Sequence, residues 1–292
     1  MALEVRPMWE GSFGAEISGF DMTRETGQED WRRLVGASHT HGVIRLRGQK
    51  ADPAALLRLA SRFGTPVPHI LTHFHVEGHS AVLKLSNIVT DGKQWGIYDG
   101  ANYWHTDMAF EDPPGAATIV YALKTPRQGG ATRVADMYAA YDELPDAMKK
   151  RIDGLVVLHH YGNRDDLDEN STGSASKLTD EQKKQVRNVF HRLVRPHPVA
   201  GRKALYGVSG SSFGIVGMPD DEAIDLLNEL KAHATQERYV RELEYGPGDI
   251  AVWDTSCTLH AATPLAPVDS PDDPMARLLH RVSVKGRSPL FS

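Results

Sequence analysis

The sequence contains a single cysteine, Cys257, among 292 residues. One cysteine excludes an intrachain disulfide and a zinc site built from several thiolates. No stretch approaches the roughly 18 apolar residues that a membrane-spanning helix needs. The N-terminal segment MALEVRPMWEG also lacks the apolar core of a secretory signal. These absences predict a cytoplasmic protein with no membrane partner.

Clusters of one charge and nucleotide-binding loops are missing as well. The chain has 33 basic and 38 acidic residues, which are scattered and give a net charge of −5. A nucleic-acid partner is therefore not expected. The segment GVSGSSFG (207–214) is rich in glycine and serine but lacks the lysine of a phosphate-binding loop, and no G-x-S-x-G motif indicates a serine nucleophile.

The sequence contains many short runs rich in β-branched residues, which are typical of strands. No internal repeat or linker divides the chain, so we expect one domain over residues 1–292. The predicted strands lie at 14–20, 42–48, 81–87, 116–123, 130–136, 156–161, 203–208, 238–243, 249–254 and 278–286. Helices are predicted at 28–40, 52–64, 137–153, 179–191 and 219–234. Many strands with inserted helices, without regular β-α alternation, predict a mainly β fold, an antiparallel sandwich or a double-stranded β-helix (jelly roll).

Local signals support two of these helices and one loop. Asp52 is the expected N-cap of its helix, with Pro53 at the first helical position. The helix at 219–234 is expected to bury Ala223, Ile224, Leu227 and Leu230 on one face. Residues 162–180 contain almost no apolar side chain, which is typical of a solvated surface loop or of a mobile lid over an active site.

The segment YWHTDMAF (103–110) places His105 and Asp107 two residues apart. On a strand their side chains would share one face, and an imidazole with a carboxylate suits a first-row divalent metal. His260, expected just beyond a strand in AVWDTSCTLHAATP (251–264), is the candidate third ligand. Such a triad leaves one side of the metal open for a cosubstrate and O2. An H-x-D pair alone also arises by chance, so the signal depends on this third ligand.

A rival cluster lies in THFHVEGHS (72–80), where His73, His75, Glu77 and His79 loosely match a cupin metal site. No matching histidine motif follows downstream, which disfavours this alternative. Asp254 is expected either to orient His260 as a partner of this metal ligand or only to end a strand.

An ordered series of segments carries a family resemblance. The segments are GSFGAEISGFD (11–21), GVIRLRGQ (42–49), LASRFGTP (59–66), WHTDMAF (104–110), QGGATRVADMYAAYDELP (128–145), RPHPVAGRKALY (195–206), GDIAVWDTSCTLHAATP (248–264) and RLLHRVSVKG (277–286). Together they resemble the TauD/TfdA family of Fe(II)- and 2-oxoglutarate-dependent dioxygenases. The resemblance implies a reaction that uses O2, releases succinate and CO2, and hydroxylates the substrate. By analogy it also implies a homo-oligomer.

Residue by residue, the resemblance implies His105, Asp107 and His260 as iron ligands. It implies that Thr132 and Arg277 bind 2-oxoglutarate. The stretch LAPVDSPDDPMA (265–276) reads as a loop insertion between His260 and Arg277, and it leaves open whether Arg277 keeps this position.

The resemblance also implies a substrate site. Arg281 would face a substrate anion, and one histidine, His73 or its neighbours His69 and His75, would contact the substrate. Asn102 and Tyr103 are expected to line the pocket because they directly precede the metal segment. The expected substrate is a small anionic molecule, an aryloxyalkanoate, another carboxylate or a sulfonate. The alternative is a metal-binding jelly roll without oxygenase activity, acting as a sensor or a metal-dependent hydrolase.

Overall fold

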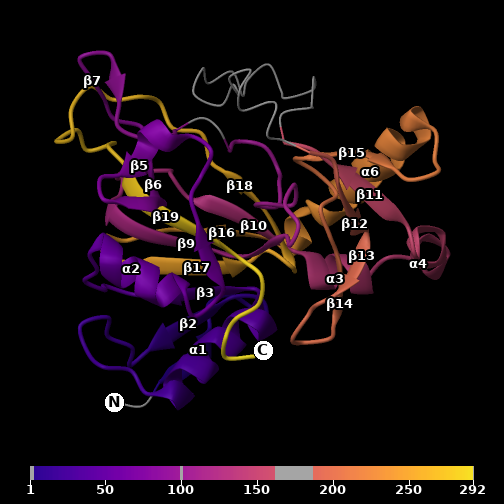
Figure 1. Cartoon of the computed structure of the whole chain (residues 1–292), viewed down its shortest axis with the longest axis horizontal. Helices are drawn as coiled ribbons and strands as arrows, with labels where there is room; N and C mark the ends of the chain where they lie inside the picture. The colour runs from indigo at the N-terminus through magenta and orange to yellow at the C-terminus, as the bar shows by residue number, and fades with distance from the viewer. Residues whose placement is uncertain (1–2, 99–100, 162–186, 292) are drawn as a thin grey trace.

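The computed structural model describes residues 3–98, 101–161 and 187–291. Within them, strands predominate and helices are inserted between them, which confirms the predicted mainly β class (Figure 1). The large sheet has the order β1 (Glu4–Pro7), β2 (Ala15–Ser18), β3 (Val43–Leu46), β17 (Ile250–Asp254), β9 (Gly115–Lys124), β19 (Leu278–Lys285), β6 (His79–Ser86) and β5 (His75–Val76). Strand β4 (Thr65–Val67) pairs with β19 off this path.

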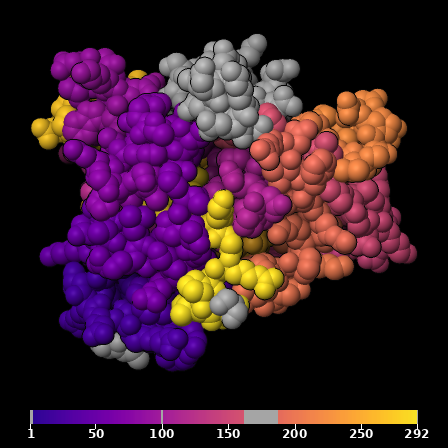
Figure 2. Space-filling view, in the orientation of Figure 1, coloured from indigo at the N-terminus to yellow at the C-terminus, as the bar shows by residue number. Residues whose placement is uncertain are grey.

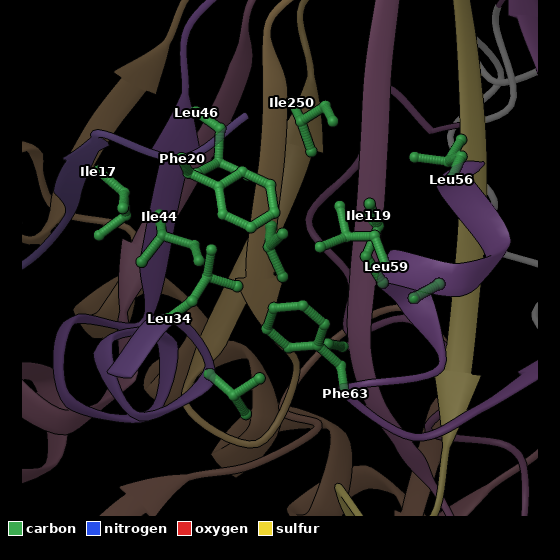
Figure 3. Packing of buried hydrophobic residues seen from close by; sticks show 14 of the residues in the cluster. Ile17, Phe20, Leu34, Ile44, Leu46, Leu56, Leu59, Phe63, Ile119 and Ile250 are labelled. Atoms are coloured by element: carbon green, nitrogen blue, oxygen red, sulfur yellow. The ribbon is translucent and has the colours of Figure 1, made fainter. Parts of the chain in front are cut away.

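Two helices pack on the large sheet and form its main core with it. They are α1 (Gln28–His41) and α2 (Pro53–Ala60). Figure 3 shows Leu34 of α1 and Phe63, just after α2, facing the apolar side chains of the strands. The predicted N-cap is confirmed, because the Asp52 carboxylate accepts the N–H of Ala55 at 2.6 Å.

A second group of elements lies beside this sheet, on the right in Figure 1. One three-stranded sheet has the order β16 (Val240–Leu243), β10 (Thr132–Asp136) and β18 (Thr258–Ala262), and another has the order β12 (Val189–Arg192), β11 (Val156–His159) and β15 (Ser212–Ile215). Smaller elements of this group are β13 (Val194–Pro196), β14 (Lys203–Leu205) and η4 (Glu237–Tyr239). Three more lie elsewhere: β7 (Val89–Thr90), at the upper left of Figure 1, β8 (Lys93–Gln94), which pairs with it, and η1 (Thr72–Phe74). The helices of the second group are α3 (Met137–Asp142), α4 (Asp146–Ile152) and α6 (Asp220–Ala234).

Several sequence predictions need correction. The helix predicted at 137–153 is two helices, because Pro145 precedes α4 and cannot continue α3. The helix predicted at 179–191 is wrong at its end, since residues 189–191 belong to β12 and pair with β11. Residues 187 and 188 of that predicted helix are in neither a helix nor a strand. The rest of the predicted helix and the predicted lid at 162–180 lie outside the described residues. In α6, Leu226 is buried in place of Ile224, which is 40% exposed.

The C-terminal segment after β19 returns to the surface of α1 and of the segment after α2. The hydroxyl of Ser288 donates to the carbonyl of Arg62, and the ring of Phe291 contacts His39 edge-on. Figure 2 shows this yellow segment running between the N-terminal part of the chain and the orange part. No helix within 3–98, 101–161 and 187–291 has the length and apolarity to cross a membrane.

Candidate metal centre

Two backbone hydrogen bonds bring the first and last parts of the site together. The N–H of His105 donates to the carbonyl of His260, and the reverse bond has the same 2.9 Å length. His260 lies in the middle of β18, where it pairs with Val134 of β10, and not beyond a strand as the sequence suggested. The two imidazole centroids are 4.1 Å apart, so residues 155 positions apart in sequence (260 − 105) present their rings to one point.

Asp107 reaches the same point from a turn. The expectation that His105 and Asp107 share a strand is wrong: His105 makes a single bridge, and the chain turns at residues 107–110. Met108 has φ +55°, a left-handed conformation that non-glycine residues seldom adopt and that often marks functional sites. Gly115 permits the close return of β9, because a Cβ there would lie 2.7 Å from the Asp107 carbonyl oxygen.

The three side chains are spaced for a shared cation. The Nε2 atom of His105 lies 3.6 Å from Asp107 Oδ1, and that of His260 lies 3.5 Å from Oδ2. These separations are too long for good hydrogen bonds but suit atoms that bind one metal ion. His105 Nδ1 donates to the Tyr103 carbonyl at 2.8 Å, which leaves the lone pair on Nε2.

The protonation states also fit a metal. Burial lowers the pKa of His260 to about 3, so its imidazole is neutral at neutral pH. Burial would raise the pKa of Asp107, but the charge of Arg281 and the two neighbouring histidines together hold it well below its usual value. The donor set is therefore one carboxylate, the neutral imidazole of His260 and the imidazole of His105, which fits Fe(II) with an open side.

A second His–Asp–His cluster looks similar but is a hydrogen-bonded network. His39 Nδ1 and His197 Nε2 lie 2.7 and 2.9 Å from the same oxygen, Oδ2 of Asp254. His197 Nδ1 accepts the N–H groups of Val199 and Ala200, so its proton is on Nε2 and that nitrogen has no lone pair for a metal. Burial alone would raise the pKa of Asp254, but the two histidine hydrogen bonds hold it below its usual range. Asp254 thus joins three segments and does not support a metal ligand.

A cavity of about 170 Å³ opens on the metal-facing atoms, and we call it the main cavity. Its wall includes the triad, Tyr103, Thr132, Trp253 and Arg281. A neighbouring cavity of about 610 Å³, the side cavity, shares part of this wall. The shared residues are His69, Met108, Phe110, Tyr161 and Arg281.

The predicted pocket residues divide into two groups. Tyr103 lines the main cavity, whereas Asn102 lines neither of the two cavities. His73 is exposed on η1 and stacks on Phe74, so His69 takes the place predicted for it. Burial lowers the pKa of His69 to about 3, and its Nδ1 accepts the Leu71 N–H at 3.2 Å. A neutral His69 therefore has its N–H on Nε2.

The rival cluster at 73–79 does not assemble. Among the described residues, the groups whose ligand atoms converge are the triad and the His39–Asp254–His197 network. The strand β5 carries His75, whose Nε2 is hydrogen-bonded to the His69 carbonyl. This histidine supports the wall of the cavity and faces no metal position.

Arg281 connects the metal centre with the pocket. Its guanidinium donates to Asp107 Oδ1 at 2.6 Å and to Ser283 Oγ at 3.0 Å. The Nε atom is buried and has no hydrogen-bond partner among residues 3–98, 101–161 and 187–291. A cation that faces both cavities and has an unused buried donor is suited to bind an anion there.

A second buried guanidinium belongs to Arg277, directly before β19. Its side chain is 5% exposed, its Nε has no partner, and no carboxylate among the described residues pairs with it. The nearby Tyr245 hydroxyl is hydrogen-bonded to Thr132 Oγ1 at 2.7 Å, and burial raises the pKa of Tyr245 to about 12. A buried cation near the Tyr245 hydroxyl, without a carboxylate partner among the described residues, is suited to bind an anion. Sequence analysis missed Tyr245, which lies just beyond β16 without a motif of its own.

The insertion at 265–276 leaves Arg277 in place because Asn87 fixes both of its ends. The Asn87 side chain donates to the carbonyls of Ala266 and Met275 at 2.8 and 3.1 Å. Its Oδ1 accepts the N–H of Arg277 at 2.7 Å. Asn87 therefore ties the two ends of the inserted segment together directly before β19. The strand β19 pairs regularly with β6 from Leu278 on and has a bulge against β9 between Leu278 and Leu279.

Gly210 allows a loop to lie against His105. Its φ is +90°, and a Cβ there would lie 2.6 Å from the Cβ of His105. We expect Gly210→Ala to lower the free energy of unfolding by about 1–3 kcal/mol through backbone strain and to weaken metal binding by displacing His105. Gly217→Ala is the control, because Gly217 has φ +77° but no atom within 4 Å of a Cβ. Equal metal affinities in the two variants, measured by titration, would contradict the expected displacement.

Comparison with known proteins places this geometry in a family. Residues 4–283 match the family described as taurine catabolism dioxygenase TauD, TfdA family. The chain belongs to this family. The alpha-ketoglutarate-dependent 2,4-dichlorophenoxyacetate dioxygenase of Cupriavidus pinatubonensis is 28% identical over 261 residues, which are 85% of this chain and 88% of the relative. The alpha-ketoglutarate-dependent sulfate ester dioxygenase of Pseudomonas putida is 29% identical over 301 residues, covering 99% and 92%.

A solved structure agrees with the sequence relatives. The crystal structure of AAD-2 in complex with Mn(II) and N-oxalylglycine has a TM-score of 0.77 to this chain at 27% identity, covering 99% of this chain and 100% of that chain. This TauD/TfdA chain is a 2-oxoglutarate-dependent non-haem iron dioxygenase that uses Fe(II), 2-oxoglutarate and O2. The alternative of a sensor or hydrolase without oxygenase activity is therefore set aside.

Proposed function

We propose that His105, Asp107 and His260 hold the Fe(II) and that the reaction hydroxylates a small organic anion beside it. The observation that carries the metal assignment is the convergence of the Asp107 oxygens and the Nε2 atoms of His105 and His260 at 3.5–3.6 Å. Bound iron with 2-oxoglutarate supplies O2 activation, with decarboxylation of the keto acid to succinate and CO2. The protein's own residues bind and orient the two organic acids and keep water away.

Arg277 and Thr132 are proposed to bind 2-oxoglutarate through its distal carboxylate. The guanidinium fork matches a carboxylate in shape and charge, and the Thr132 hydroxyl adds a neutral donor. The Thr132 hydroxyl is already aligned by Tyr245. Thr132 lies on β10 and Arg277 directly precedes β19, the strand that also carries Arg281, to which the primary substrate is assigned.

The primary substrate is proposed to place its anionic group between Arg281 and His69. Arg281 offers a charge and His69 a neutral N–H, and both line the two cavities. The rings of Phe110 and Tyr161 lie 4.5 Å apart in the shared wall and offer an apolar surface to the rest of the molecule. The relatives that act on an aryloxyacetate and on sulfate esters support an anion with an apolar body.

The test is succinate formation from 2-oxoglutarate with Fe(II) and ascorbate. The purified protein is assayed against aryloxyalkanoates, aliphatic carboxylates and sulfonates, each beside a neutral amide of the same body. We expect at least one anion to stimulate succinate formation and to be converted to a hydroxylated or cleaved product. The matching amide is expected neither to stimulate succinate formation nor to be converted. Equal stimulation by acids and amides would overturn the proposed substrate class.

Arg281→Ala is expected to raise the KM for the active anion by about 30-fold or more, because losing a buried charge partner costs about 2 kcal/mol or more. The KM for 2-oxoglutarate is expected to change little, since Arg277 remains. Metal affinity is measured in parallel, because Arg281 also bonds Asp107. A variant with the wild-type KM for the anion would refute the role of Arg281.

The proposed fold and assembly follow the family. We infer that the sheets form a double-stranded β-helix, supported by the antiparallel pairs β9–β17 and β10–β18, of which the second carries His260. A single domain, a homo-oligomer and a cytoplasmic location stay predictions.

A further inference from the structure

Each oxygen of the Asp107 carboxylate accepts a hydrogen bond from a different strand of the large sheet. The hydroxyl of Thr118, on β9, donates to Oδ2 at 2.6 Å. The guanidinium of Arg281, on β19, donates to Oδ1 at 2.6 Å. The carboxylate is thus held at both oxygens although its own backbone lies in a turn.

Thr118 and Arg281 differ in what else they face. Arg281 lines both cavities, so an incoming anion competes with Asp107 for its donors. Thr118 is fully buried, lines neither cavity, and sits in the sheet opposite Trp253 and Ser283. Its hydroxyl has Asp107 as its hydrogen-bond partner and no access to either organic acid.

We propose that Thr118 is a positioning residue that sets the orientation of Asp107 for the metal. A carboxylate on a turn can rotate about its Cβ–Cγ bond, and a ligand that rotates binds a metal weakly. A hydrogen bond from a rigid neighbouring strand removes this freedom. A neutral donor does so without placing a positive charge beside the cation.

The inner strands explain why the support is rigid. β9 pairs with β17 on one side and β19 on the other, so Thr118 cannot move without disturbing both ladders. Ser283, its register partner on β19, accepts the Arg281 hydrogen bond at 3.0 Å. The sheet therefore fixes both Asp107 donors relative to each other.

The inference rests on the proposed metal centre, and its test is metal affinity measured without turnover. Co(II) is titrated into the metal-free protein with 2-oxoglutarate present and O2 excluded. Thr118→Val keeps the side-chain shape but removes the donor, and we expect the Kd of Co(II) to rise about 10- to 100-fold, the effect typical of losing an outer partner. Thr118→Ser restores the donor and is expected to stay near wild type. The visible spectrum of bound Co(II) is expected to change in Thr118→Val but not in Thr118→Ser.

The control variants separate positioning from general damage. Ser38→Ala removes another fully buried hydroxyl, which bonds only the Val35 carbonyl, and is expected to bind Co(II) as wild type does. Thermal unfolding of the metal-free proteins checks folding. If Thr118→Val does not fold, Thr118→Cys replaces it, because a thiol is a weak hydrogen-bond donor. The Thr118→Cys protein is then expected to bind Co(II) more weakly than the Thr118→Ser protein.

The two proposals fail in different ways. Wild-type affinity in Thr118→Val, or equal weakening in Thr118→Ser, would overturn the role of Thr118 alone. Retained Co(II) binding in Asp107→Ala would overturn the metal centre itself.

Discussion

Replacing His260 by alanine is expected to abolish stoichiometric Fe(II) binding and, with it, succinate formation from 2-oxoglutarate. The side chain supplies one of three protein ligands, and its loss must cost more than the roughly 10–100-fold typical of an outer partner. Because β18 is held by β10 and by the bridge to His105, the backbone is expected to stay in place when the ring is removed. The measurement is anaerobic metal titration combined with succinate assays at saturating 2-oxoglutarate.

The second His–Asp–His cluster offers a matched control. His197→Ala also removes a buried imidazole that is hydrogen-bonded to a buried aspartate. This change is expected to lower the melting temperature, because Asp254 loses a donor and two backbone N–H groups lose their acceptor. Its metal stoichiometry per folded chain is expected to stay that of wild type. If His260→Ala keeps its iron while His197→Ala loses it, the two clusters have been assigned in the wrong order.

These two clusters also show how far sequence reasoning reaches. The H-x-D segment and a distant histidine in an ordered series of motifs are enough to nominate the three residues that converge. The sequence cannot show that His105 and Asp107 leave the strand pattern, since the left-handed Met108 carries no residue signature. Nor can it show that Asp254, close to His260 in sequence, serves His39 and His197 instead.

Elements set by distant contacts are the ones that sequence patterns mispredict. Residues 189–191 read as the end of a helix, but pairing with β11 makes them a strand, because tertiary contacts outweigh local propensity. Ile224 and Leu226 both fit an apolar helical face, and only the packing of α6 on its neighbours decides which is buried. His69 and His73 differ likewise: His69, before the 3-10 turn η1, lines the cavity, whereas His73 within the turn is exposed.

Arg277→Leu is expected to raise the KM for 2-oxoglutarate by about 30-fold or more, since removing one partner of a buried charge pair costs about 2–5 kcal/mol. Leucine keeps part of the buried volume, and the Arg277 backbone stays anchored by Asn87 and by the Ser86 hydroxyl. The measurement is succinate formation as a function of keto acid concentration, at saturating Fe(II) and primary substrate. Metal affinity without 2-oxoglutarate is expected to stay near wild type, because Arg277 makes no hydrogen bond to the triad.

Two comparisons make this result specific to charge and shape. Arg277→Lys keeps the charge but loses the planar fork, so its KM for the keto acid is expected to fall between those of Arg277→Leu and wild type. Adding guanidinium to Arg277→Leu is expected to recover part of the affinity, because the cavity left beside Tyr245 retains the hydroxyl groups of Tyr245 and Thr132. If Arg277→Leu instead binds 2-oxoglutarate as wild type does while Arg281→Ala loses it, then the keto acid and the primary substrate use the opposite arginines. The clamp formed by Asn87 would in that case hold the substrate anchor and not the 2-oxoglutarate anchor.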